Sequence, residues 1–147
     1  MPAEKLSATR IIVMVILALL ALQFELGMAV NVSNQPTLAP FGFSLGGLSE
    51  ALNQIGIVAV AHASLGVWLV LFSIVSIILA LRSGVRSVQV FGSLALLATT
   101  LAATTGVLFT LSGFQNDGFS EGMATNFLLS FTFNFLELYY LKPAPKT

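Results

Sequence analysis

The chain has 147 residues, of which 56% are hydrophobic and only 8% are charged, and its formal net charge is zero. Soluble domains usually contain about 25% charged residues, so this composition excludes a soluble enzyme and indicates that the lipid bilayer is the solvent. The absence of cysteine excludes disulfides, thiolate metal sites and iron–sulfur clusters, and a single histidine excludes a His-rich metal site within one chain. No basic tract is present, so nucleic acid is not expected as a partner.

Four apolar segments are long enough to cross a hydrocarbon core about 30 Å thick, which needs about 20 helical residues. They span about 11–30, 52–81, 88–111 and 122–141. The second is longer than a bilayer requires, so it is expected to tilt or to project beyond the membrane. The sequence thus predicts an all-α integral membrane protein, a four-transmembrane-helix bundle that forms one membrane domain over residues 1–147, with outer loops at 31–51 and 112–121.

The basic residues fix the expected orientation. Four spans place three parts of the chain on one side of the membrane, and these parts hold all six basic residues: Lys5, Arg10, Arg82, Arg86, Lys142 and Lys146. Basic residues favour the cytoplasmic side. We therefore expect a multi-pass cell-membrane protein whose N-terminus, C-terminus and second loop lie in the cytoplasm.

An alternative interpretation of the first segment is a cleavable signal peptide. A basic start, an apolar core at 11–22 and the small residues Gly27 and Ala29 around Met28 fit that pattern. Cleavage after Ala29 would leave three spans. The mass of the intact protein extracted from membranes distinguishes the two possibilities.

The two outer loops contain similar sequences, residues 42–50 and 113–121, which share five of nine positions. Ser49 and Ser120 are predicted to cap the following helices, and Glu50 and Glu121 to complement the positive ends of the helix dipoles. Two capping loops that arose independently explain the similarity, and so does the duplication of a helical hairpin.

Small residues mark close helix contacts in membranes, because lipid and protein interior are equally apolar. The second and third segments carry such residues at helical spacing, and we expect the two helices to pack together along their length. The candidate packing positions are Gly56, Ala59, Ala63, Gly66, Gly92 and Gly106.

The first and fourth segments are expected to expose different faces. In the first segment one face holds Glu25 and is expected to point into the bundle, together with Met14, Ala18, Ala21 and Met28. In the fourth segment a polar stripe is expected to face protein and a row of phenylalanines to face lipid or a partner. The polar stripe is Asn126, Ser130, Asn134 and Glu137, and the row is Phe127, Phe131 and Phe135.

Polar groups at membrane depth suggest a site, because each ionisable one costs about 2.5–3.5 kcal/mol on insertion. The outer half of the bundle is predicted to collect Glu25, His62, Glu121 and Asn126. Glu25 would exchange a proton or pair with His62, or would be a protonated acid bonded between helices. Glu121 also fits a helix start, and Asn126 also fits a hydrogen bond between helices.

His62 has several possible roles. It would be an axial ligand of haem b, a proton-relay group or a hydrogen-bond partner of a quinol, or simply a histidine near the outer headgroups. Met28 and Met123 lie at similar predicted depth and are the candidate second ligands of a haem.

Three functions follow from these features. The leading hypothesis is an accessory or assembly subunit of a larger membrane complex, whose partners are the lipid bilayer and other membrane subunits or a second copy of the chain. The alternatives are a haem- or quinone-linked redox protein using His62 and a small proton-coupled transporter using Glu25. A non-enzymatic role is favoured, because no catalytic set of residues is recognisable.

Overall fold

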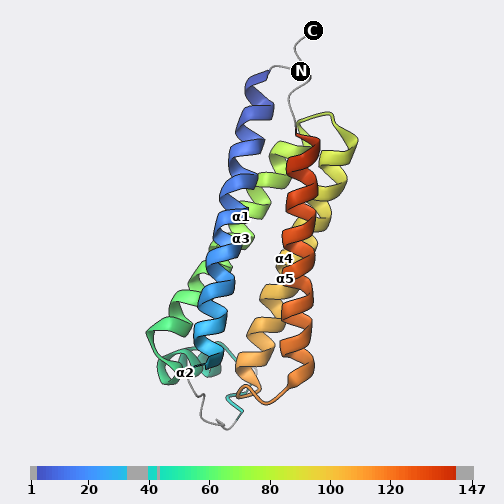
Figure 1. Cartoon of the computed structure of the whole chain (residues 1–147). Coiled ribbons are helices and arrows are strands. Elements are labelled where there is room, and N and C mark those ends of the chain that lie inside the picture. The colour runs from blue at the N-terminus through green and yellow to red at the C-terminus, as the bar shows by residue number, and fades with distance from the viewer. Residues whose placement is uncertain (1–2, 33–39, 43, 142–147) are drawn as a thin grey trace.

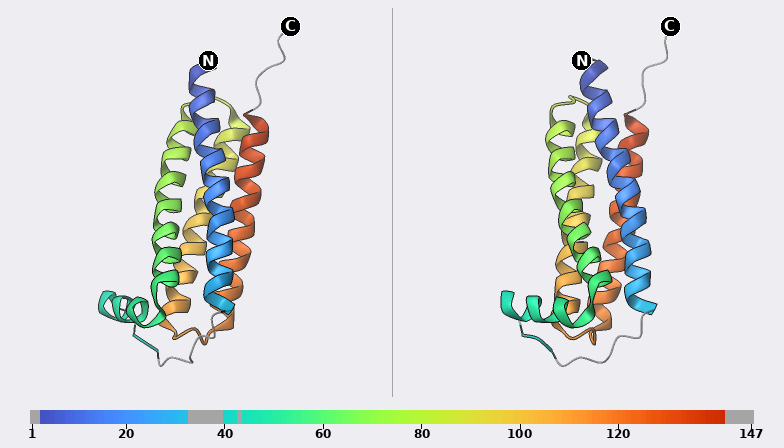
Figure 2. Two further views of the ribbon diagram at one scale, coloured as in Figure 1. Left: turned by 60° about the vertical axis from the view of Figure 1, so that its left-hand side comes forward. Right: turned by 90° about the vertical axis from the view of Figure 1, so that its left-hand side faces the viewer.

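The structure is a computed structural model that describes residues 3–32, 40–42 and 44–141 (Figure 1). Five helices follow in chain order: α1 (Ala3–Val32), α2 (Leu45–Ile55), α3 (Ile57–Leu81), α4 (Arg86–Leu111) and α5 (Asp117–Tyr140). The described residues form no strand, so the predicted all-α class is confirmed. The four long helices run side by side, and the short α2 lies across one end of the bundle (Figure 2).

Three of these helices are long and apolar enough to cross a membrane, over Ser7–Val30, Ile57–Leu81 and Arg86–Leu111. This finding supports the prediction of a membrane protein. Helix α5 has 24 residues, comparable to α3 and α4, but it is not one of the three. Its polar residues, which include Asn126, Asn134 and Glu137, lower its mean hydropathy.

The long helices form a closed ring of neighbours. Helix α1 contacts α3, α3 contacts α4, α4 contacts α5, and α5 contacts α1 again. The pairs α1–α4 and α3–α5 therefore face each other across the two diagonals of the ring. A side chain on α3 can reach α5 only through the centre of the bundle.

The predicted second segment is not one continuous helix. Gly56 separates α2 from α3 and has a φ of +92°, a conformation that residues with a Cβ rarely adopt. The backbone turns there, so α2 leaves the bundle axis (Figure 2). The prediction of one continuous helix over 52–81 is wrong, because α3 begins only at Ile57. Part of the predicted outer loop 31–51 is helical, since α2 begins within it, and its residues 33–39 and 43 lie outside the described residues.

The N-caps also differ from the prediction. Helix α2 begins after Ser44, whose Oγ accepts a hydrogen bond from the Gly47 backbone N–H at 3.0 Å, and α5 begins after Asn116, whose side chain accepts from the backbone of the first turn. Ser49 and Ser120 lie inside these helices. The predicted caps are wrong because both helices begin several residues earlier than expected.

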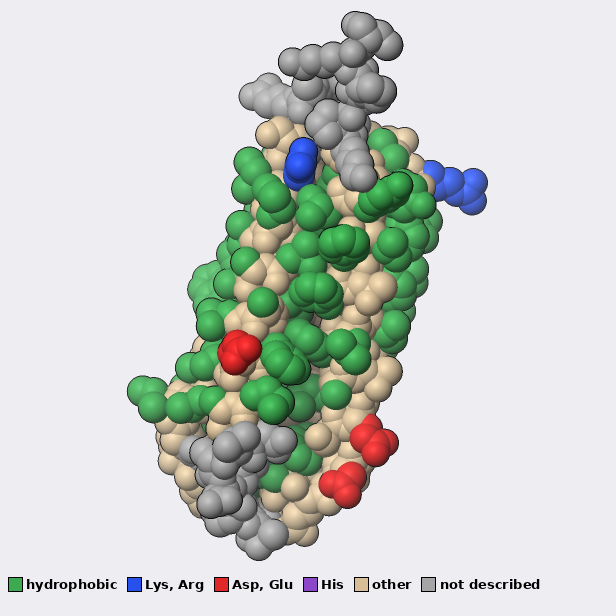
Figure 3. Space-filling view, in the orientation of Figure 1, with side chains coloured by type: hydrophobic (Ala, Val, Ile, Leu, Met, Phe, Trp, Pro, Cys, Tyr) green, Lys and Arg blue, Asp and Glu red, His purple; other side chains and the backbone are tan. Residues whose placement is uncertain are grey.

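Charge is divided between the two ends of the bundle (Figure 3). The end that holds the start of α1, the α3–α4 turn and the end of α5 is called the basic end, and its described basic side chains are Arg10, Arg82 and Arg86. The opposite end, with α2 and the α4–α5 turn, is called the acidic end and holds Glu50, Asp117 and Glu121. On the face that Figure 3 shows, apolar side chains extend along the helices between the two ends.

Candidate functional site

The bundle interior alternates between apolar and polar layers. Nearest the basic end lies the first apolar cluster, Val13, Ala80, Val88 and Leu141. Further along the axis lies the second apolar cluster, Ile16, Leu20 and Leu69, with Phe72 and Phe127 packed against it. Between these clusters along α3 and α5, and at Thr99 of α4, lies a polar layer of buried residues: Ser73, Ser76, Thr99, Ser130, Asn134 and Glu137.

Hydrogen bonds in the polar layer join three helices. The hydroxyls of Thr99 on α4 and Ser130 on α5 lie 2.7 Å apart, and the Ser73 hydroxyl on α3 donates to Thr99 Oγ1 at 3.5 Å. Asn134 Nδ2 donates to the Ser130 backbone carbonyl at 2.8 Å. The polar stripe predicted on the fourth segment therefore faces protein at these positions, as expected.

Glu137 is the charged residue of the polar layer and is 0% exposed. The Ser76 hydroxyl on α3 donates to Glu137 Oε1 at 3.4 Å, so the carboxyl reaches across the α3–α5 diagonal. Its second oxygen, Oε2, is buried without a hydrogen-bond partner. A Cβ placed on Gly92 would lie 3.2 Å from Oε1, so α4 offers the carboxyl room because it has glycine at this position.

The sequence placed Glu137 in the polar stripe but did not single it out as a site residue. The signal that marks it is its position in the series Asn126, Ser130, Asn134 and Glu137, whose steps of three and four residues fall on one helix face. Ser130, Asn134 and Glu137 of this series are all buried in the structure.

His62 lies in the acidic half of the bundle, beyond the second apolar cluster, and meets Gln23 of α1. Gln23 Nε2 and His62 Nε2 are 3.2 Å apart. Two atoms of this pair, Gln23 Oε1 and His62 Nδ1, are buried and have no hydrogen-bond partner. A Cβ added to Gly27 would lie 3.1 Å from His62 Cε1, and one added to Gly66 would lie 3.5 Å from Gln23 Nε2.

Gln23 was not among the predicted site residues. Gln23 and Gly27 are four residues apart and therefore lie on the same face of α1. A polar side chain next to a glycine on one helix face indicates that a side chain of another helix can pack there.

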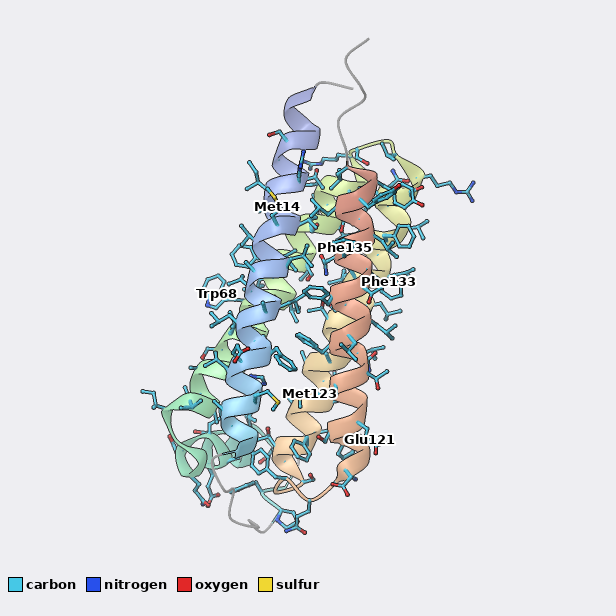
Figure 4. The ribbon with its side chains drawn as sticks, viewed as in Figure 1. Met14, Trp68, Glu121, Met123, Phe133 and Phe135 are labelled. Atoms are coloured by element: carbon cyan, nitrogen blue, oxygen red, sulfur yellow. The ribbon has the colours of Figure 1, made fainter. Side chains whose placement is uncertain are left out.

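The prediction that Glu25 points into the bundle is wrong. Glu25 is exposed, as are Met14, Ala18, Ala21 and Met28, which were assigned to the same face; Figure 4 shows Met14 on α1. Helix α1 buries instead the face that holds Thr9, Val13, Ile16 and Leu20. Both faces are apolar, so periodicity could not choose between them, and the branched side chains fill the interior better than the small ones. Glu25 therefore does not pair with His62.

The other predicted members of an outer polar cluster are not gathered together. Glu121 is exposed near the start of α5 (Figure 4). Asn126 is half-buried and donates to the Gly122 carbonyl of its own helix at 2.8 Å. The described contacts do not bring them to His62.

The candidate haem ligands other than His62 are also apart from it. Met28 is exposed on α1. Met123 of α5 packs against α4, where its Sδ would lie 3.2 Å from a Cβ added to Gly106. The described contacts bring neither methionine to His62.

The predicted packing positions divide into three groups. Ala59 and Gly92 are buried, and Ala63, Gly66 and Gly106 are half-buried. Gly56 does not pack but forms the break between α2 and α3. In the phenylalanine row, Phe131 and Phe135 are exposed as predicted, whereas Phe127 packs on the second apolar cluster.

Within the described part of the chain, no group of three or more His, Asp or Glu side chains could hold a metal ion. Comparisons with protein-family models, with curated proteins and with solved structures found no match. The bundle interior holds two polar arrangements that are candidates for function, the polar layer around Glu137 and the Gln23–His62 pair.

Proposed function

We propose that the chain crosses the membrane four times, with both termini and the α3–α4 turn in the cytoplasm. Two observations support this topology. Helix α5 lies beside α4 and α1 with a length similar to theirs, and its most polar face is turned toward the protein, which leaves a largely apolar face for lipid. The exposed arginines lie at the basic end, as expected for the cytoplasmic side.

We propose further that the protein is an accessory or assembly subunit of a larger membrane complex. The observation that carries this proposal is a row of exposed hydroxyl side chains on the outer face of α4, formed by Ser93, Thr100 and Thr104. In lipid each hydroxyl is bonded to the carbonyl four residues earlier on its own helix. Each oxygen keeps accepting capacity that a neighbouring helix can use, and small hydroxyl residues permit close approach.

Photo-cross-linking in native membranes tests this role. A photoreactive amino acid replaces Thr100 on α4 in one variant and the exposed apolar Ile74 on α3 in the control. We expect discrete protein adducts from position 100 and lipid adducts alone from position 74. Lipid adducts alone from both positions, together with a single-chain particle in lipid nanodiscs, contradict a subunit role.

A second candidate function is a haem- or quinone-linked redox protein using His62. Two buried atoms without a hydrogen-bond partner favour this function, Gln23 Oε1 and His62 Nδ1. Both belong to the Gln23–His62 pair at the contact of α1 and α3. Such atoms cost free energy unless a partner satisfies them. A hydroxyl or carbonyl of a quinol or quinone provides the matching chemistry.

The absorbance spectrum of the protein in native membranes and after mild extraction tests this second function. A bound haem or quinone that is lost in His62→Ala and kept in Met28→Leu supports it. The matched control is Met28→Leu, because Met28 is exposed on the outer face of α1. Wild-type protein that binds neither group after incubation with each contradicts it.

A further inference from the structure

Glu137 is fully buried in the bundle interior, between the first and second apolar clusters. The first apolar cluster covers it toward the basic end, and the second apolar cluster separates its layer from the acidic end. The Ser76 hydroxyl on α3 donates a hydrogen bond to its Oε1. The charged groups that approach its level on the neighbouring helices are Arg10 on α1, Arg82 after α3 and Arg86 on α4, and all three are exposed.

The aromatic hydroxyls of its own helix do not reach the carboxyl either. Tyr139 and Tyr140 follow Glu137 on α5, and both side chains are exposed. Among the described residues, no ion pair with Glu137 is formed. A charged carboxylate in this position would be buried without compensation, which costs several kcal/mol.

Two kinds of ligand can remove that charge, a cation or a proton. A metal cation needs several oxygen ligands arranged around it, whereas the carboxyl has one weak hydroxyl contact at 3.4 Å. A proton needs neither additional ligands nor additional room.

We propose that Glu137 is a proton-binding site inside the membrane domain. One proton forms an O–H bond at Oε2, the oxygen without a partner, and converts the carboxylate to a neutral carboxylic acid; release of the proton reverses the step. The proton exchanges with water at the basic end, because α5 ends at Tyr140, only about 5 Å further along the helix axis. Protonation of Glu137 is a property separate from the proposed subunit role, and either can be tested without the other.

Infrared difference spectroscopy at varied pH tests the proposal directly, because a protonated carboxyl and a carboxylate absorb at different frequencies. We expect the wild-type protein in lipid nanodiscs to show a carboxylic acid carbonyl band that converts to a carboxylate band as the pH rises. Glu137→Gln should lose this conversion. Glu25→Gln, which changes an exposed carboxyl on α1, should keep it.

Ser76→Ala keeps the proposal testable if Glu137→Gln does not fold. Loss of the hydroxyl donor to Oε1 should shift the carbonyl band of the acid without removing it. Three outcomes overturn the proposal: no acid band at any pH, a band that is the same in folded Glu137→Gln, or a band that responds to sodium ions at constant pH.

Discussion

Ser76 and Glu137 meet across the diagonal of the bundle, with the serine hydroxyl 3.4 Å from Oε1 of the carboxyl. They belong to α3 and α5, which are not neighbours in the ring of helices. The contact therefore crosses the bundle interior between α3 and α5, beside Gly92 of α4. The Ser76–Glu137 hydrogen bond thus links α3 directly to α5, two helices that do not pack side by side.

Glu137→Ala should lower the free energy of unfolding by about 2–4 kcal/mol, because it leaves a cavity and removes the acceptor of the Ser76 hydroxyl. Unfolding in detergent micelles, followed by circular dichroism, measures the change. Glu25→Ala is the matched control and should change stability by less than about 0.5 kcal/mol, because Glu25 is exposed. Equal losses in the two variants contradict the central position of Glu137.

Gly92→Leu should destabilise the bundle by about 1–3 kcal/mol through overpacking. Even a Cβ at this position would lie 3.2 Å from both Ala80 Cβ and Glu137 Oε1, so a larger side chain must separate α4 from α3 and α5. The control is Ser93→Leu on the exposed face of the same helix. Thermal unfolding of the two variants side by side measures the difference, and an unchanged Gly92→Leu protein refutes the close packing.

Gly56→Ala should strain the junction of α2 and α3 by about 1–2 kcal/mol, because an L-residue disfavours a φ of +92°. Gly46→Ala is the control, since Gly46 lies within α2 and the nearest atom to its added Cβ is 3.8 Å away. Two spin labels, at Asn53→Cys on α2 and at Ile74→Cys on the exposed face of α3, report the distance between α2 and the bundle. A distance distribution that is the same in both variants contradicts the role of Gly56.

Single-cysteine labelling tests the proposed topology, and the natural chain contains no cysteine that would interfere. Asn53→Cys on α2 should react with a membrane-impermeant maleimide added to intact cells. Ala8→Cys, near the start of α1, should react only after the cells are permeabilised. Both positions are exposed, so their accessibility is matched. The reverse pattern shows that the bundle has the opposite orientation.

Several features of the fold were predictable because they depend on local sequence. Long apolar segments predict helices, and the polar stripe of α5 predicts which side of that helix faces protein, since Ser130, Asn134 and Glu137 are costly in lipid. The short turn between α3 and α4 falls between the second and third predicted segments, whereas both predicted outer loops were too long because α2 and the start of α5 lie within them. The break at Gly56 was not predicted, because it lies inside an apolar segment. Hydrophobicity alone does not show that the helix axis changes direction there.

The candidate sites were less predictable. Gln23 and His62 are 39 positions apart, and neither the spacing nor the composition of the two segments indicates that they meet. The prediction of a polar cluster around Glu25 was wrong for a related reason. It assumed that an acidic residue on α1 must face the bundle interior, but Glu25 is exposed. A carboxyl in the outer half can instead lie at the surface.

The sequence by itself determined the all-α class of the described residues, the long apolar segments that could cross a membrane, and the buried face of α5. Only the tertiary structure decided the buried face of α1, the pairing of Gln23 with His62 and the meeting of Ser76 with Glu137. The physical reason is that lipid and protein interior are equally apolar, so hydrophobic periodicity does not separate them. Burial in such a bundle is decided by the shapes of neighbouring helices, and those are known only once the helices are packed.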